Sequence, residues 1–318
     1  MNRLKILIVS KFLYARGGAE TYAISLGEML KMHNHEVRFF SMSYPENINV
    51  NENEYFVKEV SFFQSSLNAK LKAALRVFGV GVKRNYEKIL DDFQPDVIHL
   101  NNIHSYLSPI VAELAHKRGI KVIWTVHDYK LICPTYSFLC QGKPCEACIE
   151  NKYSVISRKC MKNSLLASLL AWGEIMYWNK GRLSRWTDAF ICPSNFMAQK
   201  MMQGGYPANK LHVIYNFIDS GKVKLISELS SEERELAYVY LGRLSKEKGI
   251  EELLKVAEQL PYKLYIAGRG PLEDILKQKY SSDNIKFVGH LSAEKIIKLF
   301  KNCLLYTSPS PRDSTSSR

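Results

Sequence analysis

Apolar positions along the chain follow two spacings, one typical of strands and one of helices. Lys5–Ser10 contains a continuous apolar run of the kind found in buried parallel strands, and Ala19–Lys31 has apolar residues at helical spacing after a Gly17-Gly18 turn. Further strand-like runs occupy Val37–Ser41, Asp96–Leu100, Lys121–Val126 and Ala189–Cys192, and helix-like stretches occupy Leu67–Phe93 and Pro109–Arg118. Strands that alternate with helices predict a parallel sheet covered on both faces.

A polar segment, Asp219–Glu235, interrupts this pattern, and a second alternation follows it. The expected strands are Ala237–Leu241, Lys263–Ala267, Ile285–Val288 and Cys303–Leu305, and the expected helices are Ile250–Gln259, Leu272–Lys279 and Ala293–Lys301. We therefore predict the α/β class, with two Rossmann-like doubly wound domains, residues 1–219 and 220–306, that face a cleft at the carboxyl ends of their strands. The second domain is small for this architecture and is expected to be incomplete.

The last residues, 307–318, are rich in serine and proline and have no apolar periodicity. They do not fit a strand or a helix of the second domain. We interpret them as the end of a truncated reading frame with a foreign tail, similar to translated adapter sequence. A natural disordered tail is the alternative.

Composition and charge narrow the class of protein. The length of 318 residues suits about two domains, and 46% hydrophobic with 24% charged residues is typical of a globular chain. The N-terminus lacks the pattern of a signal peptide, and no apolar run approaches the roughly 20 residues of a membrane span. We expect a cytoplasmic protein with reduced cysteines. The formal net charge of +13 indicates an anionic partner.

The segment Leu241–Gly249, between a predicted strand and a predicted helix, has the composition of a diphosphate-binding loop. Gly242 allows the backbone to pass close to a ligand, and Gly249 opens toward the next helix N-terminus. Arg243 and Lys248 bring two cations to the same loop. A loop with solvated charges is the alternative interpretation.

Two other glycine pairs lie in strand-to-helix loops. Gly268 and Gly270 follow the next predicted strand, where they indicate either a tight turn or a binding element. Gly17-Gly18 precedes the first helix, whose free backbone N–H groups favour an anion. This pair does not complete Gly-x-Gly-x-x-Gly, and no acidic residue ends the second strand, which disfavours a dinucleotide-dependent dehydrogenase. The sequence also lacks the P-loop motif of nucleotide triphosphatases.

Histidines lie at the ends of two predicted strands. His127-Asp128 follows Lys121–Val126, at the edge where α/β enzymes place functional groups. A histidine there hydrogen-bonds either a sugar hydroxyl or a backbone carbonyl, so a structural role stays open. His99 and His104, around another strand end, are expected to serve packing or the acceptor side.

These motifs, with Pro193–Phe196 and Val213–Asp219, occur in an order that resembles the large retaining family-four glycosyltransferases of GT-B fold, of the cell-envelope polysaccharide type. The similarity covers residues 4 to about 305. It implies transfer of a hexose-type sugar, with retention, from a nucleoside-diphosphate sugar to a cell-envelope glycan or lipopolysaccharide, or to a lipid-linked acceptor. It implies no catalytic cofactor or divalent metal, because arginine and lysine hold the diphosphate.

The resemblance also implies roles for individual residues. Donor binding falls to Gly18, Asn216, Gly242, Arg243, Lys248, Gly268 and Gly270, and His127 lies near the transferred sugar as a catalytic residue. The family usually has Asn-Gly where this chain has Asn216-Phe217, and phenylalanine tolerates positive φ poorly. The family's pair of glutamates is absent after Leu305, so this chain is expected to be impaired or inactive.

Two other functions remain open from the sequence. One is a nucleotide-sugar epimerase of the same fold, which acts on the donor without an acceptor. The other is a non-catalytic interaction module that binds a metal and retains a degenerate transferase scaffold.

Five of the seven cysteines lie between Cys133 and Cys160. Cys145 and Cys148 form a C-x₂-C pair, which Cys140 and Cys160 complete to a tetrahedral thiolate set for structural zinc. An iron–sulfur cluster, buried reduced cysteines and a redox-sensitive loop are the alternatives.

Basic residues concentrate in Leu67–Leu90 and in Lys152–Trp186, and the second stretch also contains three tryptophans. Basic segments with aromatic residues suit an anionic membrane surface, here the inner face of the cytoplasmic membrane, to which the protein would bind peripherally. A solvated basic helix face is the alternative. Nucleic acid is not expected as a partner, because no recognition motif accompanies the charge.

Overall fold

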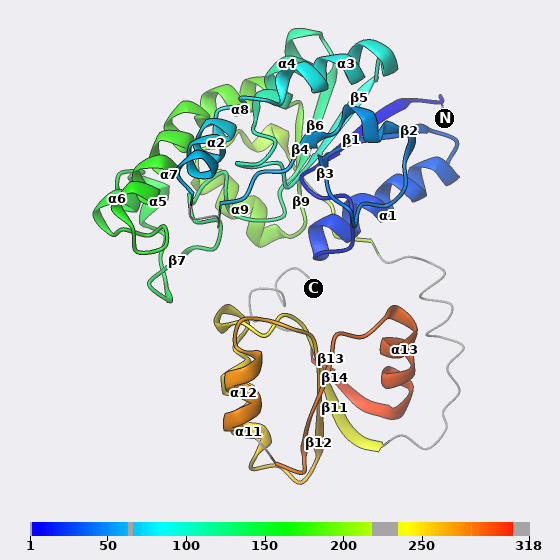
Figure 1. Ribbon diagram of the computed structural model, residues 1–318, viewed down its shortest axis with the longest axis vertical. Helices are drawn as coiled ribbons and strands as arrows, with labels where there is room; N and C mark the ends of the chain where they lie inside the picture. The colour runs from blue at the N-terminus through cyan, green and yellow to red at the C-terminus, as the bar shows by residue number, and fades with distance from the viewer. Residues whose placement is uncertain (1, 63–65, 218–234, 281, 308–318) are drawn as a thin grey trace. The chain divides into compact units, whose positions relative to one another are not determined.

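The computed structural model describes residues 2–62, 66–217, 235–280 and 282–307, which form two compact units, Met1–Asn216 and Phe217–Arg318 (Figure 1). The predicted linker lies outside the described residues except for Glu235, and so does the predicted tail beyond Thr307. The two units are described separately.

The first unit contains a six-stranded parallel sheet in the order β10-β9-β6-β5-β1-β2. Its strands are β1 (Lys5–Ser10), β2 (Glu36–Phe40), β5 (Val97–Asn101), β6 (Lys121–Thr125), β9 (Ala189–Cys192) and β10 (Leu211–Val213). The chain leaves β1 toward β2 and returns on the other side of β1 to form β5. This reversal places a topological switch point between β1 and β5, where the loops diverge at the carboxyl edge of the sheet.

Helices cover both faces of this sheet. They are α1 (Gly18–Met32), α2 (Leu67–Val77), α3 (Lys83–Phe93), α4 (Ile110–Lys117), α5 (Ala147–Glu150), α6 (Ser154–Ser157), α7 (Leu165–Tyr177), α8 (Lys180–Trp186) and α9 (Asn195–Gln203), with 3₁₀ turns η1 (Asn51–Tyr55) and η2 (Ala208–Lys210). In Figure 1, α1 lies on one side of the sheet, and α3, α4 and α8 lie on the other.

Two short strand pairs lie outside the main sheet. Strands β3 (Met42–Ser43) and β4 (Val57–Lys58) pair in parallel, and β7 (Leu139–Cys140) and β8 (Lys143–Pro144) form a small antiparallel hairpin. The hairpin belongs to the cysteine-rich segment.

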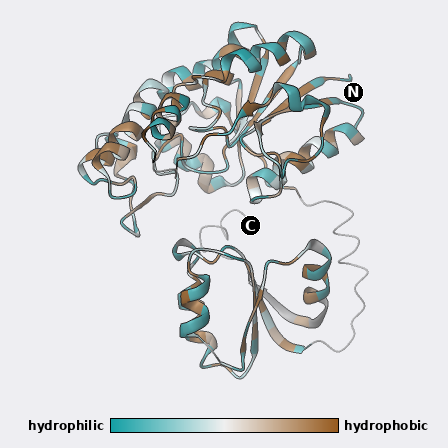
Figure 2. Ribbon diagram, in the orientation of Figure 1, coloured by the Kyte–Doolittle hydropathy of each residue, from teal (hydrophilic) through white to brown (hydrophobic). Residues whose placement is uncertain are grey.

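Strand side chains form the centre of the first unit's core. Leu7, Ile8 and Val9 of β1 are fully buried, as are Trp124 of β6 and Phe190 of β9. Figure 2 shows hydrophobic residues along these strands. Burial on both faces explains why β1 appears in the sequence as a continuous apolar run.

The prediction of one helical stretch over Leu67–Phe93 is wrong, because the segment forms two helices, α2 and α3. Gly79 and Gly81 separate them, with φ of 89° and 79°, in the left-handed region that glycine adopts readily. A Cβ on Gly79 would lie 2.8 Å from the Cβ of Ile110. The break therefore has both a backbone cause and a packing cause.

The second unit contains a four-stranded parallel sheet in the order β13-β12-β11-β14. Its elements are β11 (Glu235–Leu241), η3 (Lys246–Lys248), α11 (Ile250–Ala257), β12 (Lys263–Ala267), α12 (Glu273–Lys279), β13 (Ile285–Gly289), α13 (Ala293–Asn302) and β14 (Cys303–Thr307). Helices α11 and α12 cover one face and α13 the other (Figure 1). The predicted α/β class with two Rossmann-like units is confirmed. Within the described ranges, no helix is long and apolar enough to cross a membrane.

Candidate functional site

Polar side chains gather at the carboxyl edge of the first sheet, in the loops that follow three neighbouring strands. Lys11 follows β1, Asn101 and Asn102 end β5 and begin its loop, and His127-Asp128 follow Val126 after β6. Strand pairing sets Ser10 opposite Asn101 and Asn101 opposite Thr125. The register therefore brings these loops together at the switch point between β1 and β5.

His127 is held by Asn101. The Nδ2 of Asn101 donates to the His99 carbonyl at 3.4 Å, which turns its Oδ1 toward His127. The Nε2–H of His127 donates to that oxygen at 2.9 Å, and the Tyr22 ring meets the imidazole edge-on with centroids 5.0 Å apart. Burial lowers the pKa of His127 to about 3, so the ring is neutral and its Nδ1 is an acceptor.

His99 and His104 are also neutral, for the same reason. The Nε2 of His99 lies 2.7 Å from Thr125 Oγ1, and burial lowers the pKa of His99 to about 4. His104 stacks on Trp124 with centroids 5.3 Å apart, and burial lowers its pKa well below the ordinary value. Its 3.9 Å approach to Asp128 is therefore not an ion pair near neutral pH. These contacts support packing roles for both rings.

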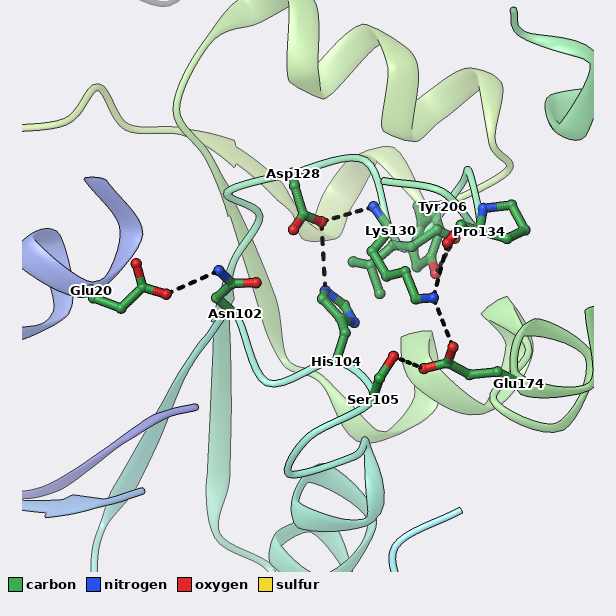
Figure 3. Close-up of polar contacts among 10 residues, drawn as sticks. Glu20, Asn102, His104, Ser105, Asp128, Lys130, Pro134, Glu174 and Tyr206 are labelled. Atoms are coloured by element: carbon green, nitrogen blue, oxygen red, sulfur yellow. Dashed lines mark hydrogen bonds and ion pairs between the residues drawn. The ribbon is translucent and has the colours of Figure 1, made fainter. Parts of the chain in front are cut away.

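Charged groups also lie at this edge, and Figure 3 shows Asp128 beside His104. Asp128 Oδ1 accepts from the Lys130 backbone N–H at 2.9 Å, and burial raises the pKa of the Asp128 carboxyl while Lys11 and Lys130 oppose that rise. Burial lowers the pKa of Lys11, which Asp128 and Glu20 partly offset. Glu20, buried in the first turn of α1, accepts from Asn102 Nδ2 at 3.3 Å. This edge presents both donors and acceptors of the kind that bind hydroxyl groups.

A buried ion pair connects the loop after β6 to α7 (Figure 3). Lys130 Nζ lies 2.7 Å from Glu174 Oε2, and the two side chains are only 11% and 8% exposed. Lys130 Nζ also donates to the Pro134 carbonyl at 2.9 Å, and Ser105 Oγ donates to Glu174 Oε1 at 2.8 Å. Each charged side chain therefore has a further hydrogen-bond partner besides the other member of the pair, which a buried ion pair requires.

Sequence patterns did not select four further polar residues of this edge, Lys11, Glu20, Lys130 and Glu174. Lys11 and Lys130 lie one and five residues after the carboxyl ends of β1 and β6, a signal that strand-end position would have provided. Glu20 and Glu174 are helical residues whose inward direction depends on tertiary packing. Charged helical residues ordinarily face solvent, so the sequence pattern alone did not select them.

The remaining candidates of the first unit lie apart from this hydrogen-bonded set. Gly18 begins α1 and is exposed, with no atom within 4 Å of an added Cβ. The carboxylate of Glu20 already provides negative charge in the first turn of α1, so the predicted donor contact of Gly18 stays a prediction. Asn216 is exposed at the end of the unit, and Phe217 is not among the described residues with positive φ.

In the second unit, the loops after β11 and β12 bind each other through their backbones. Gly242 N–H donates to the Ala267 carbonyl at 3.0 Å, and Leu244 N–H donates to the Arg269 carbonyl at 3.1 Å. A Cβ added to Gly268 would overlap the Gly242 carbonyl oxygen, and a Cβ added to Gly270 would overlap the Leu244 carbonyl oxygen. These two glycines are therefore required by the contact between the loops, whatever else they bind.

Arg243 and Lys248 lie on the loop between β11 and α11, at the carboxyl edge of the second sheet. The Tyr240 hydroxyl donates to the Arg243 carbonyl at 3.0 Å, and the Arg243 side chain is exposed. Lys248 ends η3, and Gly249, with φ of 63°, turns the chain into α11. The structure thus places the predicted cations and a helix N-terminus on one loop.

Only part of the predicted zinc site is assembled. The Sγ atoms of Cys140 and Cys160 are 3.3 Å apart, and Arg158 Nη1 donates to Cys145 Sγ at 3.4 Å. Burial raises the pKa of Cys148 to about 11 and that of Cys160 to about 12. In the part of the chain that the structure describes, no group of three or more histidine, cysteine or acidic side chains is arranged to hold a metal. Zinc binding stays a prediction.

Comparison with known families decides the class of protein. The sequence profile of Glycosyltransferase Family 4 matches residues 16–222, which is more than half of the chain. The chain belongs to glycosyltransferase family 4. The profile of Glycosyl transferases group 1 matches residues 223–316, so the two matches extend over both units. The predicted glycosyltransferase family is confirmed.

Relatives of this family 4 chain are distant in sequence. An uncharacterized 42.6 kDa protein in the cps region of Klebsiella pneumoniae is 24% identical over 313 residues, which cover 93% of this chain and 76% of that protein. An uncharacterized glycosyltransferase of Methanocaldococcus jannaschii is 30% identical over 122 residues, which cover 33% of this chain and 31% of that protein.

Solved structures share the fold of this family 4 chain. The catalytic domain of starch synthase IV from Arabidopsis thaliana, bound to ADP and acarbose, has a TM-score of 0.58, 15% identity, and coverage of 96% of this chain and 78% of its own. The lipopolysaccharide outer core galactosyltransferase WaaB has a TM-score of 0.52, 14% identity, and coverage of 95% and 73%. HepE of Anabaena in complex with UDP-glucose has a TM-score of 0.53, 16% identity, and coverage of 96% and 73%. The predicted GT-B fold is confirmed.

Substitution of Gly268 should destabilise the second unit. In Gly268→Ala, the new Cβ meets the Gly242 carbonyl, and φ of 145° is unfavourable for alanine, so we expect a loss of stability of about 2 kcal/mol or more. Hydrogen exchange of the β11 and β12 amides measures this loss. Gly18→Ala, with open space around the new methyl, is the control and should leave their exchange unchanged. If the amides of Gly268→Ala exchanged at the wild-type rate, the prediction would be wrong, because the two loops could then separate at little cost in stability.

Acidification should destabilise the first unit through His127. Its folded pKa of about 3 lies below the unfolded value of 6.5, so the unfolded state binds more protons between these values. The stabilisation is complete above about pH 6.5 and is lost as pH falls toward 3. We expect the urea midpoint to drop between about pH 7.5 and 5. His127→Gln should make this dependence shallower, with His99 and His104 accounting for the part that remains. His116→Gln, on the exposed face of α4, should leave the dependence unchanged, and equal slopes in all three proteins would refute the assignment.

Metal analysis tests the cysteine cluster. We expect about one equivalent of zinc in anaerobically purified protein, because four thiolates at this spacing suit a structural site. Cys145→Ser with Cys148→Ser should lose the metal, and Cys303→Ser, in the other unit, should retain it. Less than about a tenth of an equivalent of zinc or iron in the wild type would exclude a metal centre.

Proposed function

We propose that the protein transfers a sugar from a nucleoside-diphosphate sugar to a cell-envelope glycan or lipid-linked acceptor, with retention of the anomeric configuration. The observation that carries this proposal is the loop Gly242–Gly249, which presents Arg243 and Lys248 beside the N-terminus of α11. Family membership supports the transfer reaction. The cps-region relative supports a polysaccharide acceptor, and the UDP-glucose complex of HepE supports a nucleotide-sugar donor.

Electrostatics explain how this loop would promote transfer. Breaking the glycosidic bond of the donor leaves negative charge on the departing nucleoside diphosphate. Two cations on one loop would stabilise that charge more in the transition state than in the ground state. Arg243 and Lys248 would therefore do the work that a divalent metal does elsewhere. We propose transfer that needs no metal cofactor.

The first unit would bind the sugar and the acceptor. Neutral His127 presents Nδ1 as a hydrogen-bond acceptor, because its Nε2–H is committed to Asn101. Such a ring recognises a sugar hydroxyl but does not protonate a leaving group near neutral pH. Lys11 and Asp128 add a donor and an acceptor at the same edge. His127 would thus position the transferred sugar, with the diphosphate loop providing charge stabilisation.

The epimerase alternative shares the fold, so the fold does not separate the two reactions. The family match favours transfer. Products distinguish them, since a transferase releases nucleoside diphosphate only with an acceptor, whereas an epimerase changes the sugar of the donor. A non-catalytic interaction module would bind no nucleotide sugar.

Nucleotide binding by the full chain tests the donor loop. UDP, GDP and ADP are titrated by calorimetry, and at least one should bind. Arg243→Ala and Lys248→Ala should each weaken binding by about tenfold, because each removes a charge-assisted contact to phosphate. Lys246→Ala, an exposed cation on the same loop, is the matched control and should change affinity by less than about twofold. Binding of none of the three nucleotides would favour the non-catalytic module, and equal losses in all three variants would indicate a nonspecific charge effect.

The proposed acceptor also suggests where the protein works. A lipid-linked acceptor is presented at a membrane surface, so we propose a cytoplasmic protein that binds peripherally to the inner face of the cytoplasmic membrane. The net charge of +13 supports attraction to anionic lipids.

A further inference from the structure

Helix α7 directs polar and small side chains toward the core and large apolar side chains toward solvent, the reverse of an ordinary surface helix. Its buried side carries Ser168, Ala171 and Glu174. Its solvent side carries five large apolar residues, Leu165, Leu166, Leu169, Met176 and Tyr177. Leu166 is 79% exposed. A water-exposed helix normally places such residues toward the core, and Figure 2 shows α7 as a largely hydrophobic helix.

Buried polar contacts fix this orientation. Glu174 pairs with Lys130 and accepts from Ser105, and the Oγ of Ser168 accepts from the Met161 N–H at 3.1 Å. Rotating α7 to bury its leucines would expose these partners and leave Lys130 as an unpaired buried charge. Such a loss is more costly than the exposure of a few leucines. The apolar face is therefore held outward by the structure.

Helix α2 carries a second exposed apolar stripe, and its C-terminal end contacts the C-terminal end of α7. It exposes Leu67, Leu71 and Leu75, which lie on one helix face at i, i+4 and i+8, and Leu67 is 83% exposed. The Nε1 of Trp178, just after α7, donates to the Val77 carbonyl at the end of α2, at 2.8 Å. The Phe78 and Tyr177 rings meet edge-on at 5.4 Å. We call the eight exposed apolar residues of these neighbouring helices the α2/α7 surface (Figure 1).

Positive charge borders this surface. The exposed cations on or next to the two helices are Lys70, Lys72, Lys159, Lys162, Lys180 and Arg182. Between Asn151 and Trp186 the sequence contains one acidic residue, Glu174, which forms the buried ion pair with Lys130. The surface therefore combines protruding apolar side chains with an excess of exposed basic over acidic side chains.

We propose that the α2/α7 surface docks the protein on an anionic lipid bilayer. The leucines would enter the boundary between headgroups and acyl chains while the lysines and Arg182 contact lipid phosphates. A second copy of this chain is the less favourable occupant, because it would bring an identical basic border against the first and like charges would repel. This inference deepens the proposed function, since it identifies the face that a lipid-linked acceptor would approach.

Vesicle binding by the full chain tests the surface. Co-sedimentation is measured with phosphatidylglycerol–phosphatidylcholine vesicles and with pure phosphatidylcholine vesicles. We expect binding to the anionic vesicles that weakens in high salt, and at least about tenfold weaker binding to the neutral ones. The triple variant Leu165→Ser, Leu166→Ser, Leu169→Ser should lose at least about tenfold in affinity for the anionic vesicles. Lys162→Glu with Lys180→Glu should show a similar loss.

Met32→Ser is the matched control, because Met32 is an exposed apolar residue, at 73%, on the distant helix α1. It should bind vesicles like the wild type. Equal binding by the wild type and the leucine variant would overturn the proposal. The proposal would also be overturned if the wild type did not bind vesicles but sedimented as a dimer, and the leucine variant sedimented as a monomer. The surface would then bind a second copy of the chain.

Nucleotide titration of the same variants separates this inference from the proposed function. The leucine variant should bind nucleotide like the wild type, and an unchanged circular dichroism spectrum and thermal unfolding midpoint should show that its first unit is folded. Arg243→Ala should bind vesicles normally. Loss of vesicle binding in Arg243→Ala would show that membrane contact depends on the donor loop and would overturn the assignment to α2 and α7.

Discussion

The ion pair between Lys130 and Glu174 is the contact on which much of the first unit depends. Two charges removed from water are stable only if each is paired and its remaining hydrogen-bonding capacity is filled. Ser105 and the Pro134 carbonyl fill that capacity. One contact thereby fixes the loop that carries Asp128 and the rotation of α7. The polar edge of the sheet and the apolar outer surface are consequences of the same buried pair.

Charge at the two carboxyl edges is distributed differently. In the first unit, burial keeps His99, His104 and His127 neutral, so recognition there relies on hydrogen bonds. In the second unit, Arg243 and Lys248 lie on a loop that ends at a helix N-terminus, so that edge favours anions. The first edge therefore offers hydrogen-bonding groups around neutral imidazoles, and the loop of the second unit offers two cations.

Periodicity predicted the two α/β units well, because strands buried on both faces leave continuous apolar runs such as that of β1. It failed over Leu67–Phe93, where two glycines with positive φ break a pattern that still has helical spacing. His127 was predicted as a site residue because strand ends are recognisable in sequence, and the structure places it at the carboxyl edge of the sheet. Glu20 and Glu174 were not predicted, since inward-facing acids on helices depend on partners distant in the chain. Cysteine spacing predicted a cluster, but spacing alone does not fix how many thiols meet.

The backbone contact between the loops after β11 and β12 has a consequence for divergence within the family. Because Gly242, Leu244, Gly268 and Gly270 leave no room between the two loops, neither can lengthen without displacing the other. Insertions or deletions that are ordinarily tolerated in surface loops would be selected against here. Side chains around this pair of loops can change without such displacement, because the close contact is made by the backbone.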